Sequence, residues 1–317
     1  MTYWHRAFAT GGTLFLALLT LSSYAGAQTL KTLYSFTGGA DGGNPNGSPV
    51  IGSGGLLYGT TCEGGTSNYG TVFSLTPPSS PGGSWTEAVL YSFMGSPNDG
   101  SCPSGSLVIG SGGALYGATM SGGQCSGATT CGTVFSLTPS SSPGGAWTET
   151  IIYNFMGGSD GAYPNGSLAI GSGGVLYGTT GQGGSGVVPG CPAGCGTVFS
   201  LAPPVSPGGA WTGTVLHTFD SPRSGAYPTT GVVIGKGGVL FGATDEGGTS
   251  GRGGTVFAVL PPASPGGAWA ERILYGFKGP PTDGEGAVSL VIGRGGVLYG
   301  TTQFGGIGCG GAAQCSR

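Results

Sequence analysis

Charged residues and histidine are scarce in this sequence. Only 7% of the residues are charged, with 9 Lys and Arg against 12 Asp and Glu, and no basic run occurs. This composition argues against nucleic acid and anionic membrane surfaces as partners. The histidines are His5 and His217, so a Ser-His-Asp or Cys-His triad has almost no histidine to use. No apolar run reaches the 18 residues of a transmembrane helix, so none is predicted.

The amino-terminal segment has the pattern of a signal peptide. Arg6 precedes a short apolar run from Leu14 to Leu21, and Ala25-Gly26-Ala27 follows as a small-residue cleavage site. We therefore expect residues 1–27 to be removed and the mature chain to begin at Gln28. The protein is then expected in the extracellular space or on the cell surface.

Glycine and proline are abundant and recur at fixed intervals. The 74 Gly and 22 Pro residues separate short runs of Val, Ile, Leu, Tyr, Phe and Thr, as turns separate short strands. A composition this rich in glycine predicts disorder when it has no period. The period therefore favours a folded all-β chain.

The period is a repeat of 57 to 64 residues. Each repeat contains four predicted strands, named A to D, which in the first copy span residues 48–52, 56–61, 70–75 and 85–93. Four consecutive antiparallel strands form the blade of a β-propeller. Aromatic strands D end at Phe36, Phe93, Phe155, Phe219 and Phe277.

The sequence thus predicts a single repeat domain over residues 28–317, a β-propeller of five four-stranded blades. The chain begins with a strand D at residues 30–36, which is expected to close the last blade. The last repeat is incomplete, because no Gly-Thr-Val-Phe strand follows Cys315, and its exposed edge should invite pairing. A β-solenoid is the alternative, although its coils are commonly shorter.

Two aromatic positions have a packing explanation. Trp recurs five residues before the Leu or Ile of strand D, which favours packing between blades over a sugar-binding platform. His217 replaces a Tyr of the other strands D, so we expect it to lie in a Tyr niche. The Trp positions are Trp85, Trp147, Trp211 and Trp269.

The combined repeat motif resembles a known family. The strings Leu-Tyr-Ser-Phe, Asp-Gly, Pro-Asn-Gly-Ser, Leu-Tyr-Gly-Thr-Thr and Gly-Thr-Val-Phe-Ser-Leu are similar to the GloVer (Gloeo/Verruco) tandem repeat of bacterial exoproteins. The resemblance covers residues 30–309. It implies a secreted or surface-sorted repeat protein, often with a sorting anchor, which this sequence lacks.

Acidic residues recur at two positions of the repeat. Glu87, Glu149 and Glu271 share one position of strand D, where we expect solvated surface. The second set precedes glycine between strand D and the next strand A, where Asp-Gly is first a turn signal. Ligand or calcium contact is the alternative, and catalysis a weaker one. This set is Asp41, Asp99, Asp160 and Asp283.

Any ligand is expected on the face where the D-to-A connections meet the B-to-C loops. These loops vary and carry the four Asp together with Tyr163 and Tyr227, which could bind hydroxyls and sugar faces. The opposite turns repeat nearly unchanged. We therefore expect a monomeric, non-enzymatic binding or structural module for a glycan or cell-surface partner. The alternative is a glycosidase or lyase on a propeller scaffold.

Eight cysteines in a secreted chain predict disulfides rather than a zinc site. Three pairs lie within single B-to-C loops. The remaining two, Cys62 and Cys102, should bridge the first blade to the second, because strand B ends on the face where the next strand A begins. The local pairs are Cys125 with Cys131, Cys191 with Cys195, and Cys309 with Cys315.

Overall fold

The computed structural model describes residues 30–124, 131–142, 145–184, 189–206, 208–220, 224–248, 253–264 and 266–306. The signal peptide expected at residues 1–27 and the Cys309–Cys315 pair lie outside these ranges. The chain divides into Met1–Thr32 and Leu33–Arg317, and every strand belongs to the second unit.

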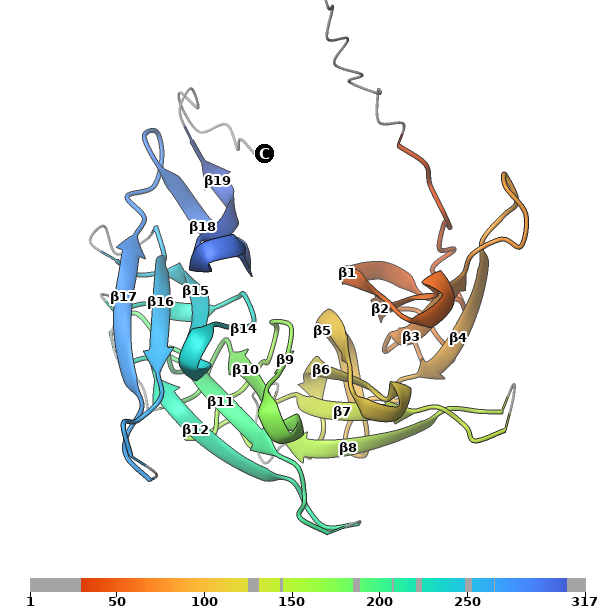
Figure 1. Cartoon of the computed structure of the whole chain (residues 1–317), viewed down its shortest axis with the longest axis horizontal. Helices are drawn as coiled ribbons and strands as arrows, with labels where there is room; N and C mark the ends of the chain where they lie inside the picture. Colours follow the sequence, from red (N-terminus) through yellow and green to blue (C-terminus); the bar gives the residue numbers. More distant parts are fainter. Residues whose placement is uncertain are drawn as a thin grey trace, which may run out of the picture. The chain divides into compact units, whose positions relative to one another are not determined.

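The strands form antiparallel sheets that follow one another along the chain (Figure 1). The first contains β1 (Gly43–Ile51), β2 (Leu57–Glu63), β3 (Thr71–Thr76) and β4 (Thr86–Ser92). The second contains β5 (Gly100–Ile109), β6 (Leu115–Gly122), β7 (Thr133–Thr138) and β8 (Thr148–Asn154). The third contains β9 (Ala169–Ile170), β10 (Leu176–Thr180), β11 (Thr197–Ala202) and β12 (Thr212–Thr218).

The fourth sheet divides strand A into two pieces, and the fifth is smaller. The fourth contains β13 (Ala226–Pro228), β14 (Val233–Ile234), β15 (Leu240–Glu246), β16 (Thr255–Leu260) and β17 (Ala270–Gly276). The fifth contains β18 (Gly284–Ile292) and β19 (Leu298–Gly305). The all-β propeller class predicted from the sequence is confirmed.

Glycine permits two recurring features of each sheet. Strands A and B are joined by a short 3-10 turn, Ser53–Gly55 in the first sheet, whose Gly54 and Gly55 have φ of +67° and +77°. Gly59 in strand B faces Phe73 of strand C, and a Cβ at Gly59 would lie 2.5 Å from Cζ of that ring. The glycine of Leu-Tyr-Gly therefore makes room for the phenylalanine of Thr-Val-Phe.

The hydrophobic core lies between neighbouring sheets, in three clusters of buried residues. At the first boundary, Phe93 of strand D packs edge-on against Phe135 of the next sheet, with ring centroids 5.1 Å apart. Tyr58 meets Trp147 of the next sheet at 5.9 Å. The second boundary repeats both contacts. The expectation that the tryptophans pack between blades is confirmed for Trp147, Trp211 and Trp269, and it stays a prediction for Trp85.

The expected strand at residues 30–36 is not a strand in the structure. In the four larger sheets strand D pairs with strand C, and within the described residues no strand C follows β19. Leu33–Phe36 therefore has no such partner in the last sheet. Phe36 nevertheless packs on Phe73 at 4.8 Å, the contact that Phe93 makes with Phe135. The segment keeps the side-chain packing of a strand D without its backbone pairing.

None of the helices in the described ranges is long and apolar enough to cross a membrane.

Candidate functional site

The D-to-A connections and the B-to-C loops meet on one face, as predicted. A glycine N–H near the start of a B-to-C loop donates to a carbonyl of the connection beside it: Gly65 to Gly39 at 2.9 Å, and Gly123 to Asp99 at 2.8 Å. We call these two sets of loops, with the first residues of each strand A, the loop face. Backbone hydrogen bonds fix it as one surface.

The four repeated aspartates hold the turns of the loop face. Asp99 accepts hydrogen bonds from the Tyr91 hydroxyl at 2.8 Å and the Met94 N–H at 2.7 Å, and it is only 2% exposed. The other members likewise accept a Tyr hydroxyl and a turn N–H: Asp41, Asp160 and Asp283. The turn role is confirmed, and ligand contact by these carboxylates stays a prediction.

Hydrogen bonds also set the charge of Asp41. The side chain and backbone N–H of Thr37 donate to it and lower its pKa below the usual value. The carboxylate is thus kept ionised while it holds the turn.

The glutamates of strand D are not the solvated surface that the sequence predicted. Each carboxyl has one oxygen buried without a hydrogen-bond partner: Glu87, Glu149 and Glu271. Glu149 and Glu271 lie at the boundary with the preceding sheet, near Tyr91 and His217. Burial, with the nearby charge of Asp99, raises the pKa of Glu149 to about 7. A buried carboxyl favours its neutral form when no cation lies beside it.

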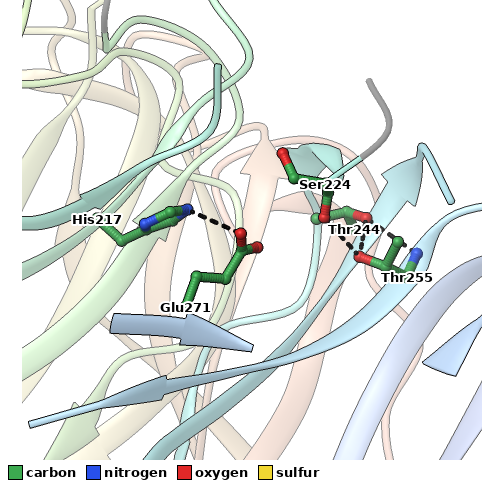
Figure 2. Close-up of polar contacts among 5 residues, drawn as sticks. All are labelled: His217, Ser224, Thr244, Thr255 and Glu271. Carbon is green, nitrogen blue, oxygen red and sulfur yellow. Dashed lines mark hydrogen bonds and ion pairs between the residues drawn. The ribbon is translucent and has the colours of Figure 1, made fainter. Parts of the chain in front are cut away.

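The third and fourth sheets meet through a variant of this arrangement. His217 packs edge-on against Phe219 at 4.8 Å, as Tyr153 does against Phe155 at 5.0 Å, which confirms the Tyr niche. Its Nε2 lies 3.6 Å from a carboxyl oxygen of Glu271 (Figure 2). Ser224 takes the position of the turn aspartate and lies beside Thr244 and Thr255, apart from this pair.

Burial acts in opposite directions on the two members of this pair. It lowers the pKa of His217, against the charge of Asp220, and raises the pKa of Glu271 to about 7, with a further increase from Asp220. Their side chains are 19% and 14% exposed. Burial therefore disfavours the charged form of each group. The contact is not predicted by the strand pattern, although the paired change of Tyr to His217 and of Asp to Ser224 is a visible signal.

Tyr163 and Tyr227 share an uncommon backbone conformation on the loop face. Each precedes a proline at the start of strand A with positive φ, +59° and +55°, which costs an ordinary side chain about 1–3 kcal/mol. Their N–H groups donate to Cys131 and Cys195 of the preceding sheet at 3.0 and 2.9 Å. The equivalent residues also have positive φ: Asn44, Cys102 and Gly286.

The disulfides between described cysteines agree with the sequence prediction. Cys62 is bonded to Cys102, joining β2 to β5, and Cys191 is bonded to Cys195 within one loop. Cys131 is also disulfide-bonded, and its expected partner Cys125 lies outside the described residues. Among the described residues, no group of three or more His, Cys, Asp or Glu is placed to share a metal ion.

The chain is similar to solved structures at low sequence identity. The chain is similar to the type-IX secretion component PorZ of Porphyromonas gingivalis, with 15% identity and a TM-score of 0.49, over 84% of this chain and 33% of PorZ. It is also similar to an endo-arabinase of Bacteroides thetaiotaomicron, with 14% identity and a TM-score of 0.39, over 81% and 87% of the two chains. A search of curated proteins found no match.

A family model gives the closer assignment. The Gloeobacter/Verrucomicrobia repeat matches residues 9–188 and 124–313, which together span most of the sequence. These segments include all five sheets. The chain therefore belongs to the Gloeobacter/Verrucomicrobia repeat family.

Proposed function

We propose that this chain is a secreted, non-enzymatic binding module whose loop face recognises an extracellular glycan or a cell-surface component. One observation carries the proposal: repeats with the same strained backbone before strand A present different side chains there. Asn44 is exposed, Cys102 is bridged, and Tyr163 and Tyr227 are half-buried. A fixed backbone with variable side chains suits recognition better than packing.

The two tyrosines have the chemistry for such a ligand. A Tyr ring gives an apolar surface for a sugar face, and its hydroxyl gives a hydrogen bond. The Tyr227 hydroxyl donates to the Gly190 carbonyl at 2.9 Å, which holds this ring on the loop face. Contacts on two successive sheets would give weak but multivalent binding.

The disulfides and the expected signal peptide support an extracellular location. A glycosidase is the competing activity, and it would need two carboxylates facing the same sugar. The turn aspartates point instead to Tyr hydroxyls and to backbone N–H groups. Polysaccharide hydrolysis is therefore assayed together with binding.

The test is a glycan array on the purified mature protein and on Tyr163→Asn/Tyr227→Asn. Asn tolerates positive φ and already occupies this position at Asn44, so the variant should keep the fold. We expect bound glycan to fall at least about tenfold, the loss of one or two such contacts. Asp99→Ala is a poorer probe, because it removes the buried carboxylate that holds the turn.

The matched control is Lys236→Ser/Arg294→Ser on the opposite turns, where other repeats carry Ser53, Ser111 and Ser172. It should leave binding unchanged. Binding that depends on the control pair and survives the tyrosine changes would place recognition on the other face. Release of sugar from a polysaccharide would overturn the non-enzymatic assignment.

A further inference from the structure

A cavity of about 120 Å³ lies between the second and third sheets, and its described lining does not include Tyr163 or Tyr227. Its floor is apolar and fully buried, formed by Phe155, Phe199 and Leu201. Tyr153 and Asp160 line it and are the titratable side chains among its described lining. The space exceeds the roughly 10–15 Å³ that one water requires.

The cavity exists because one repeat lacks a side chain that the others have. In three sheets a residue of strand C pairs with a glutamate of strand D: Leu75 with Glu87, Leu137 with Glu149, and Val259 with Glu271. In the third sheet Leu201 is paired with Gly213. Gly213 lines the cavity.

The tyrosine beside the cavity lies over the position of the missing side chain. A Cβ at Gly213 would lie 2.5 Å from Cε2 of Tyr153, so the ring covers the glycine. Its hydroxyl is 3.4 Å from Asp160, whereas Tyr91 lies 2.8 Å from Asp99. An occupant of the space directly over Gly213 must therefore displace this ring.

The other boundaries show what that occupant looks like. A glutamate side chain beyond Cα is a carboxyl group on a two-carbon stem, which has the composition of propionic acid. We propose that the cavity at Gly213 is a binding site for a short-chain monocarboxylic acid, with its alkyl stem on Phe199 and Leu201 and its carboxyl beside Tyr153 and Asp160.

The site selects the protonated acid. An anion would face the Asp160 carboxylate with no cation among the described lining residues, whereas a neutral carboxyl can donate a hydrogen bond to it. The equivalent native carboxyl, Glu149, has its pKa raised to about 7 by burial and Asp99. Affinity for the acid should therefore fall about tenfold for each pH unit above the acid's own pKa.

The experiment is an NMR titration of the folded mature protein with ¹³C-labelled propionic acid between pH 4.5 and 7.5, and with propionamide. We expect one site for the acid, weakening as pH rises, and a propionamide affinity that does not change with pH. Gly213→Glu fills the space and should abolish both signals. Gly213→Gln should do the same without adding charge.

The reciprocal variant is Glu149→Gly, which recreates the vacant position between the first and second sheets. It should raise the number of bound acid molecules from one to two. Circular dichroism verifies that each variant is folded. Absence of binding at pH 4.5, or binding that survives both Gly213 variants, would overturn the proposal.

Discussion

The boundary between the first and second sheets and that between the third and fourth use the same three positions differently. The first boundary has Tyr91, Asp99 and Glu149, and the other has His217, Ser224 and Glu271. At the first, a hydroxyl donates to a buried carboxylate. At the other, an imidazole faces the strand D carboxyl.

The comparison shows two positions of the repeat whose residues change together. Asp99 is held by the Tyr91 hydroxyl. An imidazole in place of Tyr91 also has an N–H donor, but its ring ends nearer the backbone than a Tyr hydroxyl, so the buried carboxylate would lose this hydrogen bond. Where Tyr becomes His217, the aspartate has become Ser224. The residues at these two positions therefore change together. The strand D glutamate lies near the Tyr91 hydroxyl at the first boundary and near the His217 imidazole at the other.

The largest expected effect on stability comes from the Cys62–Cys102 disulfide. Among the described residues, the boundary between the first and second sheets has such a bond and the other boundary does not. Cys62 and Cys102 are 40 residues apart, so Cys62→Ser/Cys102→Ser should lower the free energy of unfolding by about 4 kcal/mol. Chemical denaturation measures it. Cys191→Ser/Cys195→Ser, which opens a separation of 4 residues, should cost about 2 kcal/mol. Equal losses would contradict the loop-length account.

Removing the Tyr91 hydroxyl should have the next largest effect. Tyr91→Phe leaves the buried Asp99 without one donor and should cost about 2 kcal/mol of stability. Tyr153→Phe is the control, since its hydroxyl lies 3.4 Å from Asp160, and should cost less than about 1 kcal/mol. Urea titrations of both variants make the comparison. A larger loss from Tyr153→Phe would show that the distances do not report bond strength.

The two boundaries should respond to pH in different ways. The pKa of Glu149 rises from 4.5 to about 7 on folding, so its stabilising contribution is present below pH 4.5 and lost as pH rises toward 7. The free energy of unfolding of Glu149→Gln, relative to the wild type, should therefore be higher at pH 8 than at pH 4.5 by roughly 1 kcal/mol, after allowance for solvent screening. Melting temperatures across this range measure it, and parallel curves for the two proteins would contradict it.

His217 adds an opposite dependence at the other boundary. Its pKa is lowered on folding, so its contribution is present above about pH 6.5 and lost as pH falls. His217→Tyr should remove the loss of stability at acid pH and leave the stability at alkaline pH unchanged. A change on the alkaline side would mean that Glu271, and not His217, had been altered.

The smallest effect is the energetic coupling between positions 217 and 224. His217→Tyr/Ser224→Asp rebuilds the pair of the other boundaries and should be more stable than the sum of the single changes by about 0.5–1 kcal/mol. Four thermal denaturation curves, of the wild type, the two single variants and the double variant, close the cycle. A coupling of zero would show that the two replacements are independent.

The sequence predicts the repeated elements well because each strand and turn has its own local signal. The Ser-Gly-Gly turns, the Trp packing and the Cys62–Cys102 bond all follow from residues that recur in register. Strand A was underestimated, since β1 begins at Gly43 and not at residue 48. Asn-Pro-Asn-Gly reads as a turn, yet the neighbouring strand pairs with it.

The glutamates of strand D were misread for a different reason. Their position reads as an exposed strand, because alternation identifies which residues share a face but not whether a neighbouring sheet covers it. Burial of Glu149 and Glu271 depends on the rings of the preceding repeat, some 54 to 58 residues earlier in the chain. The vacancy at Gly213 is invisible to local patterns for the same reason.

The contact between the phenylalanine of strand D and that of the next strand C has a consequence for copy number. Its geometry is the same at successive boundaries, with centroids 5.1 Å apart in Phe93–Phe135, Phe155–Phe199 and Phe219–Phe257. Duplicating or deleting one whole repeat would leave each remaining phenylalanine with an equivalent partner. At this contact a gene that encodes the chain can therefore gain or lose repeats by unequal recombination without new packing, although loss of the first or second repeat would break the Cys62–Cys102 bond.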